Sequence, residues 1–267
     1  AAARLLKLDA ARASAAISAA TSMASGSKRQ FGTMTKPVHA KGDFEAVSDF
    51  LSFLDNLNFT RVVDESSKKL STFGLDAPKF QVILSMNDEE KKGLLVGDDH
   101  PMGNRLYLAR LNEKRVLTAD ITKNLLDRNV YDLRDKTILD FKTTQINKIE
   151  LTQNDQTLTF SKNKKSWQIT KEKISAKGSE SEITNFLNTI QDALVEQFVE
   201  EKPDQLTPYG LKNSKHMVKL TILKEKLPLT LFIGKRHKSG YYAKTLAKDN
   251  IFVIKKSLFD TLSNRQF

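Results

Sequence analysis

A six-residue stretch that occurs twice constrains the fold of this chain more than any other feature. The first copy, residues 73–78, reads Phe-Gly-Leu-Asp-Ala-Pro, and the second, residues 209–214, reads Tyr-Gly-Leu-Lys-Asn-Ser. The copies begin 136 residues apart, and each is followed by a segment in which apolar and polar residues alternate. Alternation with a period of two predicts a strand with one buried face. We therefore expect two similar lobes in tandem.

An apolar stripe precedes each copy at the same offset. Its spacing of three, one and three residues predicts one face of a helix. The stripe consists of Val47, Phe50, Leu51 and Leu54 in the first lobe and of Ile183, Phe186, Leu187 and Ile190 in the second. Residues 179–182, Ser-Glu-Ser-Glu, predict a capping box before the second helix. In the first lobe Asp43 can cap the helix, but Ala46 has no carboxylate with which to return the bond.

Further strands follow each copy with only small changes of offset. A second strand ends at Gly97 or Gly234, a third begins near Tyr107 or Tyr242, and a fourth follows. An amphipathic helix is then expected at residues 121–128 and 258–265. Parallel crossovers need a dozen or more residues, and these connections are shorter. The pattern predicts the α+β class: two tandem similar lobes, each a mainly antiparallel sheet with flanking helices.

We divide the chain into an atypical N-terminal segment (1–32), a first lobe with its linker (33–141) and a second lobe (142–267). The N-terminal segment is rich in Ala and Ser. Three interpretations remain open for it: a helix or tail, a non-native remnant, or a degenerate copy of the strand pair that begins the second lobe. In the third, which we favour, residues 5–9 form a strand and Phe31 takes the place of Trp167.

The repeated stretch itself predicts a corner anchored in the core rather than a ligand-binding turn. Glycine permits a positive φ or a close backbone approach, and the flanking apolar residues would fill the core beneath it. The glycine spacing and the Lys-Ser/Thr of a phosphate-binding loop are missing. The corner residues are Phe73, Gly74, Leu75, Tyr209, Gly210 and Leu211.

Catalytic and metal-binding patterns are absent from the sequence. The chain has no cysteine, which excludes disulfides and thiolate-ligated metals. Its four histidines show no His-Glu-x-x-His spacing, and no serine lies in a nucleophile-elbow context. We interpret His216, on the apolar phase of a strand, as a hydrogen-bonded core or edge histidine rather than a ligand. We expect no enzyme activity, no catalytic residues, no cofactor and no metal site.

The net charge of the chain limits the classes of partner that it is expected to bind. Forty-three Lys and Arg against 32 Asp and Glu give a net charge of +11. Such a charge favours acidic proteins, anionic lipids or nucleic acids, but nucleic acid is disfavoured because no known module signature occurs. The hairpin of the second lobe reads Lys235, Arg236, His237 and Lys238, where the first lobe has Asp-Asp-His-Pro at 98–101. We predict that the basic loop binds an acidic partner or headgroup.

The corner, the strand after it, the Gly-then-Tyr hairpin and the linker 133–141 (Leu-Arg-Asp-Lys-Thr-Ile-Leu-Asp-Phe) together resemble the bacterial domain-of-unknown-function 4340 family. The resemblance covers residue 33 to the end. It implies tandem copies of this unit, an N-terminal membrane anchor and genes beside gliding-motility-type ABC transporter components. No catalytic residues come with it. The sequence departs from the pattern in showing no anchor, and in having Asn213 and Ser214 where the first copy has Ala and Pro.

We therefore expect a non-enzymatic, extracytoplasmic (periplasmic) accessory or scaffold module of a membrane complex of the gliding-type ABC transporter kind. Its partners would be permease or ATPase subunits, and its anchor would lie in a segment not visible here. The alternative is a binding module for an anionic lipid or polysaccharide. A third reading, an enzyme with a site made between the lobes, has no motif in its favour.

Overall fold

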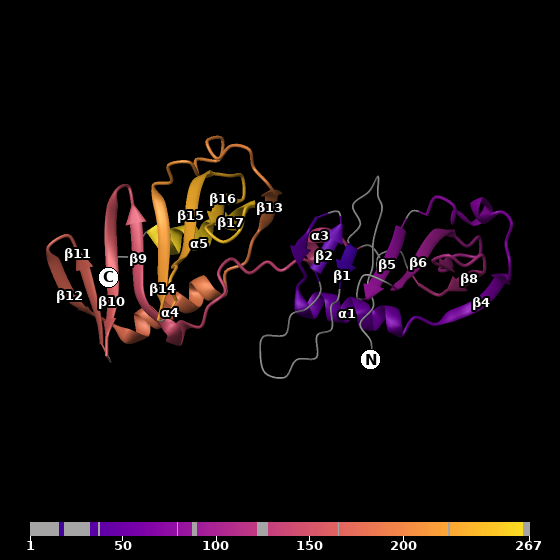
Figure 1. Ribbon diagram of the computed structural model, residues 1–267, viewed down its shortest axis with the longest axis horizontal. Coiled ribbons are helices and arrows are strands. Elements are labelled where there is room, and N and C mark those ends of the chain that lie inside the picture. Colours follow the sequence, from indigo (N-terminus) through magenta and orange to yellow (C-terminus); the bar gives the residue numbers. More distant parts are fainter. Residues whose placement is uncertain are drawn as a thin grey trace. The chain divides into compact units, whose positions relative to one another are not determined.

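The structure is a computed structural model that divides into two compact units, residues 1–135 and 136–267 (Figure 1). The residues described are 16–18, 33–36, 38–78, 80–86, 90–121, 128–164, 166–223 and 225–263. Both units are α+β, with mainly antiparallel sheets and a few helices, which confirms the predicted fold class.

The second unit contains a nine-stranded sheet in the order β12-β11-β10-β9-β14-β15-β16-β17-β13. Every neighbouring pair in this order is antiparallel. Its strands are β9 (Ile146–Gln153), β10 (Gln156–Asn163), β11 (Ser166–Lys171), β12 (Ile174–Gly178), β13 (Gln197–Glu200), β14 (His216–Ile222), β15 (Leu229–Arg236), β16 (Gly240–Thr245) and β17 (Ile251–Lys255).

Two α-helices and a short 3₁₀ helix complete the described part of the second unit. They are η2 (Thr143–Gln145), α4 (Glu180–Gln191) and α5 (Lys256–Ser263). The four apolar residues predicted for one face of α4 are all buried, at 0–2% exposure. They pack with Phe160 and Trp167 of the sheet in one core. Helix α5 begins two residues before the predicted 258, and residues 264 and 265 of that prediction lie outside the described part.

The capping box predicted at residues 179–182 is wrong in one half. The Ser179 hydroxyl accepts from the Glu182 backbone N–H at 3.4 Å, as expected. Within the described residues the Glu182 carboxylate does not return a bond to Ser179. The hydroxyl of Ser181 lies 3.1 Å from that of Ser179 and provides it with a different side-chain partner. Helix α4 therefore begins with one side-chain cap and no return bond. Helix α1 of the first unit has the same kind of cap, because Asp43 Oδ1 accepts from Ala46 N at 3.0 Å.

The first unit contains an eight-stranded sheet in the order β3-β2-β1-β5-β6-β7-β8-β4. All its pairs are antiparallel except one: β1 joins β5 in parallel through Ser18 and Ser85. Its strands are β1 (Ala16–Ser18), β2 (Thr33–Lys36), β3 (Ala40–Lys41), β4 (Phe59–Asp64), β5 (Phe80–Met86), β6 (Glu90–Asp99), β7 (Leu106–Arg110) and β8 (Val116–Ala119).

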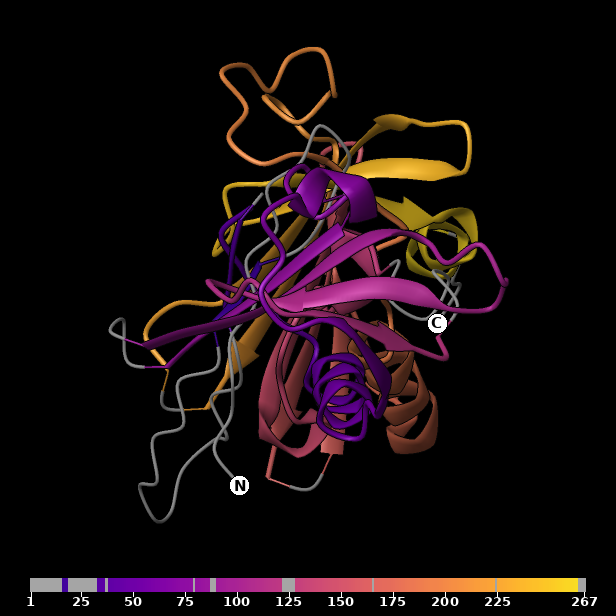
Figure 2. The same ribbon diagram turned by 90° about the vertical axis from the view of Figure 1, so that its right-hand side faces the viewer.

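The described helices of the first unit are α1 (Phe44–Asp55), η1 (Leu70–Phe73) and the short α3 (Val130–Leu133). Helix α1 lies against one face of its sheet (Figure 2). Val47 and Phe50 are fully buried there, while Leu51 and Leu54 are partly buried against the same core, which confirms the predicted stripe. Most of the helix predicted at 121–128 falls on residues 122–127, outside the described part.

Two expectations concern the ends of the first unit. The strand predicted at residues 5–9 and the role given to Phe31 lie outside the described residues, so β1 alone represents the N-terminal segment. The predicted linker, in contrast, is well defined. Arg134 bridges to Gly42 in the first unit, whereas Ile138, Leu139 and Phe141 belong to the core of the second. The division between units therefore falls after Asp135.

Candidate functional site

The repeated stretch forms the same corner in both units, held by glycines on two segments. Gly74 and Gly210 adopt positive φ angles of 65° and 70°. Opposite them, a Cβ added at Gly97 would lie 2.0 Å from the carbonyl oxygen of Phe73, and one at Gly234 would lie 2.1 Å from that of Tyr209. Only glycine allows the corner to approach the strand this closely.

Buried leucines and backbone bonds fix each corner to its sheet. Leu75 and Leu211 are 2% and 5% exposed. Their backbone N–H groups donate to Leu70 O and Leu206 O, both at 3.0 Å. In the second unit the N–H of Lys235 also donates to Tyr209 O at 2.8 Å. The corner thus fixes the backbone at the end of β15, where the predicted partner-binding loop begins.

Three rings in contact with one another join each corner to the neighbouring hairpin. In the second unit Tyr209 and His237 each lie 5.1 Å, centroid to centroid, from Tyr242. In the first unit Phe73 lies 4.9 Å and His100 lies 5.2 Å from Tyr107. Three of these four contacts are edge-to-face, an arrangement that aromatic rings prefer, and the His100–Tyr107 pair is tilted. His100 and His237 lie at the same sequence distance after Gly97 and Gly234, and they therefore occupy equivalent positions in the two units.

Both histidines support the hairpin turn that they begin. His100 Nδ1 accepts from Met102 N at 3.2 Å, and His237 Nδ1 accepts from Ser239 N at 3.4 Å. In addition, His237 N donates to Gly240 O at 2.8 Å. An Nδ1 that accepts from a backbone N–H places the proton of the neutral ring on Nε2. His237 is therefore a turn-forming residue, and Lys235, Arg236 and Lys238 bring positive charge to the loop around it.

The cationic loop, defined as Lys235, Arg236, His237 and Lys238, presents that charge to solvent. Lys235, Arg236 and Lys238 are exposed, while His237 is half-buried. Among the described residues, no carboxylate pairs with the three cations. The added Cβ atoms again show the equivalence of the units: one at Gly210 would touch Lys235, whereas one at Gly74 would touch Asp98. The same backbone position therefore carries a negative side chain in the first unit and a positive one in the second.

A hydrogen bond beside the cationic loop distinguishes the second unit further. The hydroxyl of Tyr209 donates to Glu200 Oε2 at 2.6 Å, joining the corner to β13. This bond, with smaller contributions from burial and from the negative charge of Glu200, raises the pKa of Tyr209 above its ordinary 10.0. Phe73 has no hydroxyl with which to make such a bond. The sequence alone did not lead us to this bond. Its signal was that Tyr209 and Glu200 correspond, at the constant offset of the repeat, to Phe73 and Asp64.

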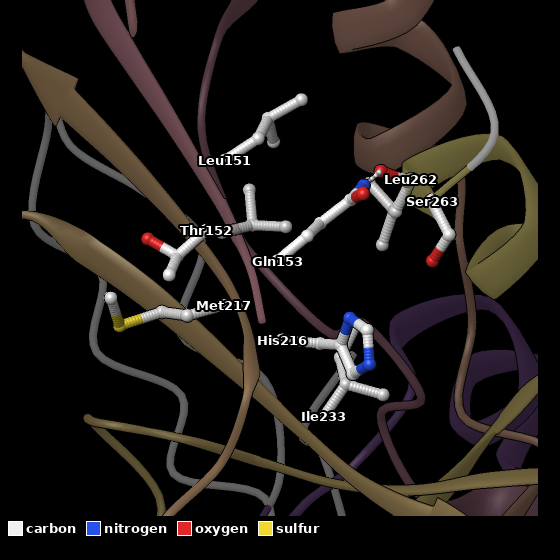
Figure 3. A pocket seen from close by; sticks show the side chains of 9 residues that line it. Leu151, Thr152, Gln153, His216, Met217, Ile233, Leu262 and Ser263 are labelled. Carbon is white, nitrogen blue, oxygen red and sulfur yellow. Dashed lines mark hydrogen bonds between the residues drawn. The ribbon is translucent and has the colours of Figure 1, made fainter. Parts of the chain in front are cut away.

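A shallow hollow lies elsewhere in the second unit, where β9, β14 and β15 meet the end of α5 (Figure 3). Gln153 Nε2 donates to Leu262 O at 2.7 Å and closes one side of it. His216 stands on Phe259, with ring centroids 5.2 Å apart. The prediction that His216 is hydrogen-bonded is wrong for Nδ1, which is buried without a partner in the described part. Burial, and secondarily the charge of Lys215, lowers the pKa of His216.

Across the described ranges, no group of three or more His, Asp or Glu side chains is placed to hold a metal ion. No helix in the same ranges is long and apolar enough to cross a membrane. The glycine corner and its ring contacts are side-chain arrangements that recur in both units.

The fold and the repeated corner define a tandem protein made of two related α+β units. The family model described as Domain of unknown function (DUF4340) matches the chain twice, at residues 33–214 and 167–267. The chain belongs to this DUF4340 family, and the two overlapping matches agree with a tandem arrangement. No curated protein and no solved structure matches the chain.

Proposed function

We propose that this protein is a non-enzymatic, extracytoplasmic accessory subunit of a membrane complex, and that its cationic loop contacts that complex. The complex is an ABC transporter of the gliding-motility type. In this proposal the two units form a scaffold, and the partners are the permease or ATPase subunits of the transporter. An anchor outside the described residues would hold the protein at the membrane surface.

The observation that carries the proposal is the charge inversion on one repeated backbone. The corner needs Gly210 and Gly234, and its ring contacts need His237 and Tyr242. It does not need a particular charge at the position after the second glycine, because Asp98 and Lys235 both fit there. The exposed cations of the second unit are thus available for a contact outside the chain. Complementary charge of this kind favours both the choice of partner and the rate of association.

Family membership supports the transporter as the partner. The resemblance in the corner and linker implies genes beside gliding-type ABC transporter components, and the matches to the DUF4340 model cover the same residues. Genes that lie together commonly encode subunits that act together. The family itself supplies no reaction, so the proposal assigns a contact and no catalytic step.

Charge reversal tests the contact directly. The variant Lys235→Glu, Arg236→Glu, Lys238→Glu should keep its fold, because all three side chains are exposed. We expect it to recover at least about tenfold less permease and ATPase than the parent in gentle affinity purification from native membranes. Thermal unfolding of the purified variant, compared with the parent, checks that the second unit is intact.

A matched control separates the loop from total charge. Lys171, Lys173 and Lys177 are also exposed, and they lie on or between β11 and β12. Their triple change to Glu alters the net charge equally, so recovery of the transporter should stay at the parental level. Equal losses in both variants, or no loss in the loop variant, would contradict the role given to the loop.

An anionic lipid or polysaccharide is the second candidate, favoured by the net charge of +11. A basic residue near an anionic membrane surface contributes about 1 kcal/mol to binding. The test is flotation with vesicles that contain phosphatidylglycerol, at low and high salt. Salt-sensitive flotation that the loop reversal abolishes, together with no recovery of transporter subunits, would favour this candidate over the first.

A further inference from the structure

The outer edge of β13 shows how the second unit accepts a short extended segment. Val195, just before β13, donates its backbone N–H to Lys136 O at 2.8 Å. Thr137 and Leu194 form an antiparallel bridge at the same place. The next residue, Glu196, donates to Val253 O of β17 on the opposite side. Residues 136–137 therefore lie on the outer edge of the sheet, in the manner of an added strand.

Side chains that follow this added segment anchor it. Ile138, Leu139 and Phe141 are 2%, 4% and 7% exposed and belong to the core of the second unit. Lys248 Nζ donates to Thr137 O at 2.6 Å and holds the bridge from the other side. Val195, beneath the segment, is only 2% exposed.

The first unit has the equivalent edge, and none of its described residues lies there as a counterpart of the segment 136–137. The offset of 136 holds without insertion from Leu54 and Ile190 to Phe73 and Tyr209, so Phe59 corresponds to Val195. Phe59 is 36% exposed, and Val62 and Val63 are 41% and 38% exposed. Strand β4 ends the sheet order, and no element of the described ranges bonds to its outer edge.

We propose that the outer edge of β4, from Asn58 to Val63, binds an extended segment of a partner protein by strand addition. Main-chain hydrogen bonds give affinity in this mode, and alternating side chains give specificity. Exposed edges with apolar side chains are otherwise a liability for aggregation. This surface is separate from the cationic loop, so the inference goes beyond the proposed function.

The second unit indicates what the bound segment is like. Its own segment has two polar residues at the bridge, then Ile138 and Leu139, and carboxylates on both sides at Asp135 and Asp140. A carboxylate suits β4, because Arg61 is exposed and has no ion pair within the described part of the chain. A second copy of this chain is a poorer occupant. It would have to withdraw residues 136–141 from the core of its own second unit.

The test uses the intact chain and a fluorescent synthetic peptide with the sequence of residues 134–141, Arg-Asp-Lys-Thr-Ile-Leu-Asp-Phe. We expect saturable binding by anisotropy and slower hydrogen exchange at the amides of 58–63. Phe59→Glu should weaken binding about tenfold, because it removes an apolar contact and repels the peptide carboxylates. Met102→Glu, which changes an 83% exposed side chain of the same unit, should leave binding unchanged. Val63→Glu is the second edge variant, for use if Phe59→Glu does not fold.

Three results would overturn the inference. The first is no binding of the peptide to the parent chain. The second is protection at residues 194–200 instead of 58–63, which would mean exchange with the segment already in the second unit. The third is concentration-dependent self-association that Phe59→Glu abolishes, which would make the edge an interface between copies. Failure of the loop reversal to affect transporter recovery would leave this result untouched, because the two surfaces share no residue.

Discussion

The two units share the half that carries the corner and differ in the half that precedes it. In the second unit β9 pairs with β14 along its length, and β10 and β9 form an antiparallel pair. In the first unit the three-residue β1 joins β5 directly, in parallel and through a single residue pair. In the second unit β10 is parallel to β14, with β9 between them. Strand β1 has the same direction relative to β5, but no described strand lies between the two. The corner half is thus the part that the described regions of the two units share most closely.

The corner half shows the same contrast between constant backbone and variable surface. Glycines, leucines and rings recur at equivalent positions of the two units. In contrast, Asp98 of the first unit corresponds to Lys235 of the second, and Phe73 corresponds to Tyr209. Positions that fix the backbone are limited by close contacts, whereas these at least partly exposed side chains differ between the units. This difference between the units leads to the following predictions.

The largest effect is expected where a Cβ would meet the backbone. Gly234→Ala should destabilise the second unit by on the order of 3–5 kcal/mol, because its Cβ would lie 2.1 Å from Tyr209 O. Denaturant unfolding followed by the fluorescence of Trp167, the single tryptophan, reports on this unit. Gly97→Ala makes the same change in the first unit and should leave the Trp167 transition where it is. A parental midpoint for Gly234→Ala would refute the account of the corner.

A smaller effect is expected at the corner glycines themselves. Gly210→Ala combines a φ of +70° with a Cβ 2.9 Å from Lys235 N, so we expect a loss of about 2–3 kcal/mol. Gly103 has a similar φ of +71° but open space around its Cβ. Gly103→Ala should therefore cost only the backbone strain, about 1 kcal/mol. Calorimetric unfolding of both variants measures the difference, and equal losses would remove the steric part of the argument.

The smallest effect concerns the bond that only the second unit has. Tyr209→Phe should cost about 1 kcal/mol, measured by the Trp167 transition near neutral pH. Folding raises the pKa of Tyr209, so its stabilisation is full below the ordinary value of 10.0 and is lost as the pH rises through the folded value. The parent should therefore lose more stability than Tyr209→Phe in alkali. Parallel pH profiles for the two proteins would count against the Tyr209–Glu200 bond.

Much of this fold was predictable because the chain contains two versions of it. The periodicity at Val47 and Ile183 placed both helices, and alternation placed the strands after each corner. The direct β1–β5 pair was not predictable, because a strand of three residues leaves no period to detect. The half-formed cap at Ser179 also escaped prediction, because a capping-box sequence allows the return bond without requiring it.

The charges of the candidate site could be predicted from the sequence, whereas its side-chain contacts could not. Comparison of residues 98–101 with the cationic loop revealed the charge inversion directly. The Tyr209–Glu200 bond joins residues on different elements, and only a comparison of Phe73 and Asp64 at the same offset could have suggested it. The unpartnered Nδ1 of His216 depends on side-chain packing against Phe259, which strand periodicity does not report.

Site-specific photocrosslinking from equivalent positions of the two units tests the central claim most directly. A photoreactive residue replaces Arg236 in one variant and Asp99, its counterpart in the first unit, in another. After irradiation in native membranes, the account predicts that position 236 crosslinks to permease or ATPase subunits of an ABC transporter and that position 99 does not. Equal crosslinking from both positions, or none from position 236, would contradict it.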